Sequence, residues 1–200
     1  MKPTLIEKTL KIASKTGVIR PKDLDKYGIP CKYLHILYKK GLLNRIARGL
    51  YVSPESEPTE RRSLAEIGKR IPQAVVCLIS ALQFHDLTTQ LPSKVWIAID
   101  RKAWLPKKIE LPVQVYRFSG KAFTEGIEEH KIEGVTEKVY NPAKTVADCF
   151  KYRKKIGIDI AIEALKDCLQ QRKCKPADIE HYARICKISS VIRPYMEAVV

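Results

Sequence analysis

The stretch LLNRIARGLYV, residues 42–52, places two arginines and one glycine within a run of apolar residues. A guanidinium is always charged and carries five hydrogen-bond donors, so Arg45 and Arg48 can bind phosphate oxygens or follow the negative potential of a narrow DNA minor groove. Gly49 can adopt the backbone angles of a tight turn. The stretch therefore predicts a hairpin with two arginines near its tip. A side chain that meets only water is the alternative for Arg45 on its strand and for Arg48 at the turn, and Tyr51 is expected to pack beneath the hairpin.

A second set of side chains suited to nucleic acid precedes that stretch. If Leu34, Leu37 and Tyr38 form the buried face of a helix that ends near Lys40, the residues between them lie on or beside the opposite face. Lysines on that face bind phosphate or a guanine edge, while tyrosine and histidine reach bases or phosphates through hydrogen bonds. A solvated helix position is an equal alternative for His35. The candidate DNA-binding residues are Lys32, Tyr33, His35, Lys39, Lys40, Arg45 and Arg48.

Charge is concentrated in the same part of the chain. The formal net charge is +15, and residues 1–54 contain 12 Lys and Arg against three acidic residues. The remaining residues contain 25 Lys and Arg against 19 acidic residues. A compact segment with so concentrated a positive field attracts polyanions, and nucleic acid is the commonest such partner. A generally lysine-rich composition is the alternative explanation.

The order of elements in residues 1–54 predicts three helices and then a hairpin. Apolar residues recur at helical spacing before Gly17, and Pro21 and Pro30 stand at the starts of the next two helices. Only Gly28-Ile29-Pro30 separates the second helix from the third, a length that suits a helix-turn-helix. With the hairpin added, the order predicts a winged helix-turn-helix, in which the third helix lies in the major groove and the hairpin contacts backbone or minor groove.

The rest of the chain predicts a larger mixed domain. The polar stretch SPESEPTER, residues 53–61, is typical of a linker, which we place at 55–61. The patterns beyond it predict helices over 64–70 and 75–87, strands over 95–99 and 113–118, a hairpin over 127–140, and helices over 142–155, 158–171, 176–187 and 191–200. The expected fold class is α+β, with a winged helix-turn-helix domain over 1–54 and a mixed α/β domain with a helical C-terminus over 62–200.

The stretch GIPCKYLHILYKKGLLNRIARGLYVSP, residues 28–54, resembles the N-terminal winged-helix segment of AbiEi-type antitoxins. Those proteins are the antitoxin and transcriptional regulator of type IV toxin-antitoxin systems linked to abortive phage infection. The positions that carry the resemblance are Gly28-Ile29-Pro30, Leu34 and Leu37, Gly41 and Leu43, Arg45, Arg48-Gly49 and Tyr51. The resemblance continues into CLISALQFHDLTTQLPSKVWIAI (77–99) and YNPAKTVADCFKYRKKIGIDIAIEAL (140–165), and it is not matched over 100–135 or 171–200.

The resemblance implies a two-part regulator that is not an enzyme. Its N-terminal domain would bind double-stranded DNA at the promoter of its own operon and repress it. Its larger C-terminal domain would supply the antitoxin activity and assist DNA binding. The functional partner would be a nucleotidyltransferase-like toxin, whose effect is countered without a stable direct complex. We expect no cofactor, metal or membrane partner, and the sequence leaves the operator, the oligomeric state and the mechanism of neutralisation open.

A metal-dependent nuclease with a winged-helix DNA-targeting domain is the alternative that the residues allow. Asp100 ends a predicted strand, and Glu129 and Lys131 form a Glu-x-Lys arrangement on another, and in this alternative the three side chains surround a divalent ion. Such pairs arise often by chance in a segment rich in Glu and Lys. His85 has no Ser or Cys nucleophile at a fixed spacing, and phosphate-loop and dinucleotide-binding glycine patterns are absent from the sequence. An adaptor that binds another protein through its helical C-terminus is a third class.

The spacing of the cysteines and the hydropathy of the chain indicate the compartment in which the protein is expected to work. None of the six cysteines forms a Cys-x-x-Cys pair, and we expect them to be reduced in a cytoplasmic protein. A zinc site built from Cys168, Cys174, His181 and Cys186 would lack the usual close pairing and is not expected. No apolar run in the sequence approaches the roughly 20 residues that cross a bilayer. The N-terminal stretch MKPTLIEKTLKIASK lacks the uninterrupted apolar core of a secretory signal.

Overall fold

The structure is a computed structural model that describes residues 4–54, 61–106 and 109–199. By their contacts the residues fall into two compact units. The N-terminal unit comprises Met1–Pro72 and His130–Glu137, and the C-terminal unit comprises Gln73–Glu129 and Lys138–Val200. The boundary between the units therefore crosses the two strands of one hairpin. Of the predicted linker, only Arg61 lies within the described residues, so the predicted domain boundary stays a prediction.

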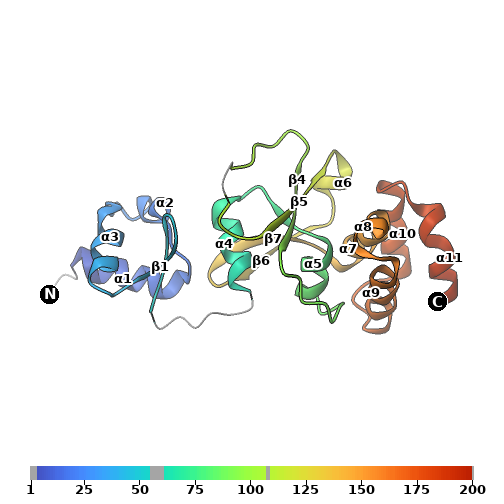
Figure 1. Ribbon diagram of the computed structural model, residues 1–200, viewed down its shortest axis with the longest axis horizontal. Coiled ribbons are helices and arrows are strands. Elements are labelled where there is room, and N and C mark those ends of the chain that lie inside the picture. Colours follow the sequence, from blue (N-terminus) through green and yellow to red (C-terminus); the bar gives the residue numbers. More distant parts are fainter. Residues whose placement is uncertain (1–3, 55–60, 107–108, 200) are drawn as a thin grey trace. The chain divides into compact units, whose positions relative to one another are not determined.

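The N-terminal unit begins with three helices and a hairpin, blue to cyan in Figure 1. The elements are α1 (Leu5–Thr16), α2 (Pro21–Asp25), α3 (Lys32–Lys39), β1 (Asn44–Ala47) and β2 (Leu50–Val52). The predicted order is confirmed, although α2 and α3 are shorter than the pattern indicates. A further helix, α4 (Arg62–Arg70), and the turn between β6 (Ile127–Ile132) and β7 (Val135–Tyr140) also belong to this unit.

Local signals set the ends of α1. The Thr4 hydroxyl accepts a hydrogen bond from the Glu7 amide, and the Glu7 carboxylate accepts one from the Thr4 amide at 2.8 Å. Such a capping box satisfies backbone donors that have no partner within the helix. Gly17, with a φ of +62°, then ends the helix. The three helices and the hairpin enclose one apolar core, made of Ala13, Ile19, Leu24, Ile29, Leu34, Leu37, Leu43 and Tyr51.

The C-terminal unit is built on a mixed sheet whose strand order is β5-β4-β3-β7-β6. Its strands are β3 (Val75–Val76), β4 (Val95–Asp100), β5 (Val113–Phe118), β6 (Ile127–Ile132) and β7 (Val135–Tyr140). Strand β3 is antiparallel to β4 and parallel to β7, and β4 is parallel to β5. The predicted helix over 75–87 is wrong at its start. Val75 and Val76 are a β-branched pair whose backbone pairs with β4 and β7, and the helix begins only at Leu78.

Helices form the rest of the C-terminal unit. They are α5 (Leu78–Phe84), α6 (Lys121–Thr124), α7 (Pro142–Lys151), α8 (Arg153–Ile156), α9 (Ile158–Gln170), α10 (Pro176–Ile185) and α11 (Ser189–Val199). The last four surround α7 at the orange and red end of Figure 1. No helix within the described part of the chain is long and apolar enough to cross a membrane.

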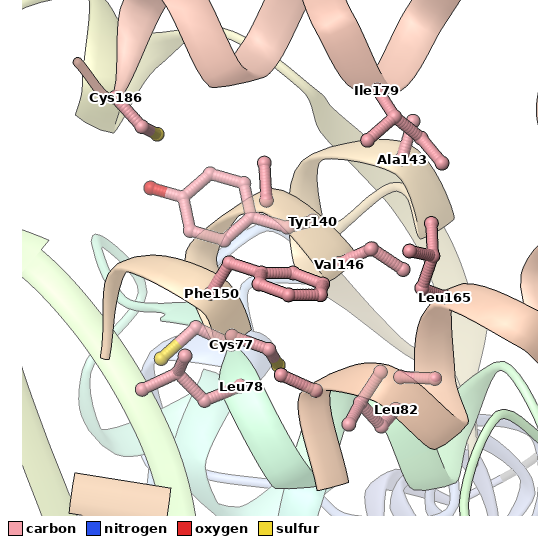
Figure 2. Packing of buried hydrophobic residues seen from close by; sticks show 14 of the residues in the cluster. Cys77, Leu78, Leu82, Tyr140, Ala143, Val146, Phe150, Leu165, Ile179 and Cys186 are labelled. Carbon is pink, nitrogen blue, oxygen red and sulfur yellow. The ribbon is translucent and has the colours of Figure 1, made fainter. Parts of the chain in front are cut away.

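Helix α7 is the centre of the C-terminal core. Asn141 caps it, because its side chain accepts a hydrogen bond from the Lys144 amide, and Pro142 occupies the first helical position, as predicted. Figure 2 shows Val146 and Phe150 of α7 between Leu78 and Leu82 of α5 on one side and the side chains of α10 on the other. The helix is therefore covered on several sides rather than on one face.

A charged pair lies inside this core. Lys144 and Asp148, one helical turn apart, are both fully buried, and the Lys144 Nζ donates to Asp148 Oδ2 at 2.5 Å. The ammonium also lies 4.2 Å from the centre of the Tyr140 ring, and the Cys186 thiol donates to Asp148 Oδ1 at 3.3 Å. Burial raises the pKa of Asp148, and the charge of Lys144 offsets part of that rise. Each charge thus depends on the other for its stabilisation.

Two of the cysteines are not reduced. Cys168, near the end of α9, forms a disulfide with Cys174, so the expectation of free thiols is wrong for this pair. The reason is tertiary: after α9 the chain reverses through Arg172, whose φ is +54°, and brings the two Cα atoms within 6.2 Å. Cys31, Cys77, Cys149 and Cys186 are free.

We expect Asp148→Asn to lower the free energy of unfolding by about 3–5 kcal/mol, because it leaves the buried Lys144 ammonium without its counter-charge. Urea denaturation of the full chain measures the change. The double variant Lys144→Met plus Asp148→Leu removes both charges and should recover most of the loss. Equal destabilisation by the single and double variants would contradict the importance of the charge pair.

Candidate nucleic-acid interface

Helix α3 presents most of the predicted binding residues to solvent. Leu34 and Leu37 are buried in the N-terminal core, whereas Lys32, His35, Lys39 and Lys40 are exposed. The helix is therefore amphipathic in the predicted register, since two buried leucines three residues apart leave the other side to the cations.

The two tyrosines of α3 differ in burial, and one of them is not buried as predicted. Tyr38 is predicted to be buried, but 42% of it is exposed. It flanks the buried leucines on the side of the hairpin, where Tyr51 covers it only by an edge contact with ring centres 6.3 Å apart. Tyr33 is half-buried against the core, and the Lys32 Nζ lies 5.8 Å from its ring centre. Tyr33 is thus only partly accessible to a partner.

The hairpin holds both predicted arginines on its exposed surface. Arg48 stands in the turn, next to Gly49, whose φ is +74°. Arg45 is exposed on β1, and its Nε donates to the Ala47 carbonyl at 3.3 Å, so its side chain follows the strand toward the turn. The pairing of β1 with β2 is irregular between Arg45 and Ala47, as expected for a β-bulge, which strengthens the local twist.

Backbone hydrogen bonds attach the hairpin to the helices. The Ile19 amide donates to the Tyr51 carbonyl, and the Tyr51 amide donates to the Ile19 carbonyl, both at 2.9 Å. The Tyr51 side chain is 8% exposed and belongs to the core, as predicted. The position of the hairpin relative to α3 is therefore set by the same residues that close the core.

The surface of this segment is strongly cationic. In residues 4–54 the exposed basic residues are Lys8, Lys11, Lys15, Lys22, Lys26, Lys32, Lys39, Lys40, Arg45 and Arg48. Of the three acidic residues, Glu7 caps α1 and Asp23 is occupied by ion pairs. The cationic field is therefore little cancelled by local carboxylates.

Asp23 fixes α2 to α4 within the N-terminal unit. Its carboxylate accepts from Lys69 Nζ at 2.6 Å and from Arg20 Nε at 3.3 Å, and Arg20 in turn donates to the Lys69 carbonyl. Burial opposes ionisation of Asp23, but the hydrogen bonds and charges of Lys69 and Arg20 outweigh it and lower the pKa. Sequence reasoning missed this contact because no local pattern links residues 46 positions apart.

Glu137 is a second acid that the sequence patterns did not single out. It is 2% exposed, and an added Cβ at Gly68 would overlap its carboxylate, so α4 approaches β7 closely there. Burial raises the pKa of Glu137 to about 8, partly offset by the Gly68 amide and by Lys69.

The nuclease alternative is not supported by the strand order. Asp100 ends β4 and Glu129 lies on β6, and β3 and β7 stand between those strands. Three inter-strand spacings separate them by about 14 Å, too far to share one ion. The Asp100 carboxylate instead accepts from the Lys102 amide, and His85 Nε2 lies 2.7 Å from the Tyr140 carbonyl. Within the described ranges no three His, Cys, Asp or Glu side chains gather as a metal site.

The arrangement corresponds to a known class of DNA-binding module. Three short helices, a tight connection between the second and third, and a basic outer face on the third are the features of a helix-turn-helix. Residues 7–54 match the family model described as "Transcriptional regulator, AbiEi antitoxin". The match of residues 7–54 to a family of transcriptional regulators implies a DNA-binding regulator and confirms the resemblance over this segment.

The whole fold also has a counterpart among solved structures. The chain is similar to the crystal structure of the RV2827C protein from Mycobacterium tuberculosis, with a TM-score of 0.62 and 14% sequence identity over 98% of this chain and 80% of that one. At that identity the likeness concerns the fold alone. The comparison with curated protein sequences gave no match.

Gly17→Ala and Gly49→Ala should differ in their effect, although both glycines have a positive φ. A Cβ at Gly49 meets no atom within 4 Å, so only backbone strain of about 1 kcal/mol is expected. A Cβ at Gly17 would overlap the Glu133 carbonyl, so Gly17→Ala should lower the free energy of unfolding by more than about 3 kcal/mol. Urea unfolding followed by circular dichroism compares them. Equal losses would contradict the close approach at Gly17.

The stabilisation from Asp23 should depend on pH. Because its pKa is below the ordinary value of 3.8 in the folded state, the contribution is present above that value and is lost as the pH falls through the lower folded pKa. Asp23→Asn should therefore lower the amide-exchange protection of α2 at pH 7, by up to about thirtyfold for an interaction of about 2 kcal/mol. Protection that is unchanged at neutral pH would refute the role of the ion pair.

Proposed function

We propose that this protein is a sequence-specific, double-stranded DNA-binding repressor of its own operon, and that it acts as the antitoxin of a type IV toxin-antitoxin system. In this proposal residues 1–54 form a winged helix-turn-helix and residues 62–200 supply the antitoxin function. The functional partner is a nucleotidyltransferase-like toxin that forms no stable complex with it. The match of residues 7–54 to the AbiEi antitoxin regulators supports this assignment.

One observation carries the DNA-binding part of the proposal. The cations of α3 and the arginines of the β1–β2 hairpin are exposed from elements that share a single core, and the Ile19–Tyr51 hydrogen bonds fix the hairpin to that core. A rigid pair of basic elements can contact one duplex at two places without first paying a large ordering entropy. A set of lysines on mobile segments would give charge attraction without a defined register.

The predicted residues divide by their role on the duplex. With α3 in the major groove, Lys32, Lys39 and Lys40 bind phosphates or guanine edges, and His35 reaches a base edge or a phosphate. Tyr33, held against the core, contributes its hydroxyl and edge. Arg45 and Arg48 follow the minor groove or the backbone beside it, where a narrow groove strengthens the negative potential.

Binding to DNA from immediately upstream of the coding sequence tests the proposal. The double variant Arg45→Ala plus Arg48→Ala should weaken binding at least about tenfold, because two groove or phosphate contacts are lost. Arg184→Ala plus Arg193→Ala removes the same charge from exposed positions of the C-terminal unit and serves as the matched control. Unaltered affinity in the first double variant would refute the assignment of the hairpin.

The salt dependence of the same binding tests the phosphate contacts. Each phosphate neutralised on a duplex contributes about −0.9 to the slope of log affinity against log salt. Lys39→Ala should therefore flatten the slope by about one unit, and Lys22→Ala, on α2, should leave it closer to the parent value. A slope near zero for the parent protein would contradict binding through this basic surface.

A further inference from the structure

A second basic surface lies on the N-terminal unit, apart from the exposed side of α3. Lys8, Lys11 and Lys15 stand on one face of α1, and together with Tyr27 they border a hollow of about 370 Å³. Ile12 of α1 and the buried Ile29, which follows the turn after α2, form its apolar floor. Thr16 completes the lining, and we call this set of seven residues the α1 hollow. It takes no part in the contacts proposed above for α3 and the hairpin.

The lysines of the α1 hollow form no ion pair, within the described residues, that would give them a structural role. None of the three ammonium groups forms an ion pair with any residue in 4–54, 61–106 or 109–199, and no acidic residue lines the hollow. Like charges three and four residues apart on a helix destabilise it by a few tenths of a kcal/mol. With a rise of about 1.5 Å per residue, the outer two lysines lie about 10 Å apart along the helix, a line that can follow a chain of phosphates.

Tyr27 gives the hollow an aromatic wall. The residue is 51% exposed, and the Lys26 Nζ lies 5.3 Å from the ring centre. The backbone there is fixed, because the Tyr27 amide donates to the Leu24 carbonyl, and the Gly28 amide donates to the Asp25 carbonyl. A fixed backbone leaves only the side-chain torsions of Tyr27 to be ordered when a partner stacks on its ring.

We propose that the α1 hollow binds single-stranded nucleic acid, with an unpaired base on Tyr27 and the adjoining phosphates on Lys8, Lys11 and Lys15. A cationic track beside an exposed aromatic ring is the arrangement by which proteins hold single strands with little dependence on sequence. A duplex is the poorer occupant, since its base faces are stacked against one another and only their edges are accessible. This inference goes beyond the duplex-binding repressor and uses different residues.

The test is the binding of labelled oligothymidylate and oligouridylate to the full-length protein at low salt, measured by fluorescence anisotropy. Tyr27→Ala should weaken binding about tenfold, whereas Tyr27→Phe keeps the ring and should keep the affinity. Lys11→Ala plus Lys15→Ala should flatten the salt slope by about 1.4, from about 0.7 per phosphate of a single strand. Binding of only one of the two oligomers would support the proposal and identify the kind of strand.

Control variants separate this proposal from the repressor assignment. Arg45→Ala plus Arg48→Ala should weaken binding of the upstream duplex and leave oligomer binding intact. Lys22→Ala, at an exposed lysine of the same unit outside the α1 hollow, is the control for Lys11→Ala plus Lys15→Ala and should leave the salt slope of oligomer binding near the parent value. The proposal is overturned if neither oligomer binds under conditions where the duplex does, or if Lys22→Ala flattens the salt slope of oligomer binding as much as Lys11→Ala plus Lys15→Ala. It is also overturned if the α1 and Tyr27 variants weaken only duplex binding.

Discussion

The paired hydrogen bonds between Ile19 and Tyr51 determine what the N-terminal unit can present to a partner. They join the connection between α1 and α2 to strand β2, so the hairpin cannot move independently of the three helices. Tyr51 also fills the core with Leu34 and Leu37 of α3. One small core thus sets the positions of both exposed basic elements, and the proposed recognition of DNA depends on that shared support.

Charged side chains are exposed on the surface of one unit and buried in the core of the other. In the N-terminal unit the lysines of α1 and α3 and the arginines of the β1–β2 hairpin stand in solvent, where they cost little and can attract a polyanion. In the C-terminal unit Lys144 and Asp148 are withdrawn completely into the core and stabilise each other, with the Tyr140 ring and the Cys186 thiol as further partners. The first arrangement serves binding, and the second makes the position of α7 sensitive to the loss of either charge.

Local signals allowed much of the fold to be predicted. The hairpin at 127–132 and 135–140 matches β6 and β7 residue for residue, because Glu133 and Gly134 both adopt the positive φ of a tight hairpin turn. The cap at Asn141 follows from its side chain and the next proline. For the candidate site, the spacing of Leu34 and Leu37 predicted which side of α3 faces solvent.

Features that depend on contacts between residues far apart in the chain could not be predicted from the sequence. The exposure of Tyr38 depends on how far the hairpin covers it, and the strand at Val75–Val76 is defined by its two neighbours rather than by its own length. The ion pair of Asp23 with Lys69 and the disulfide of Cys168 with Cys174 require the chain to fold back first. The roles of the α3 and hairpin residues on DNA remain predictions.

Chemical-shift mapping of the protein with its upstream duplex tests the central claim most directly. As duplex is added, we expect the amides of residues 32–40 and 45–49 to shift together and saturate at one stoichiometry. Duplex binding that leaves the amides of both segments unmoved, with the shifts confined to the C-terminal unit, would contradict it.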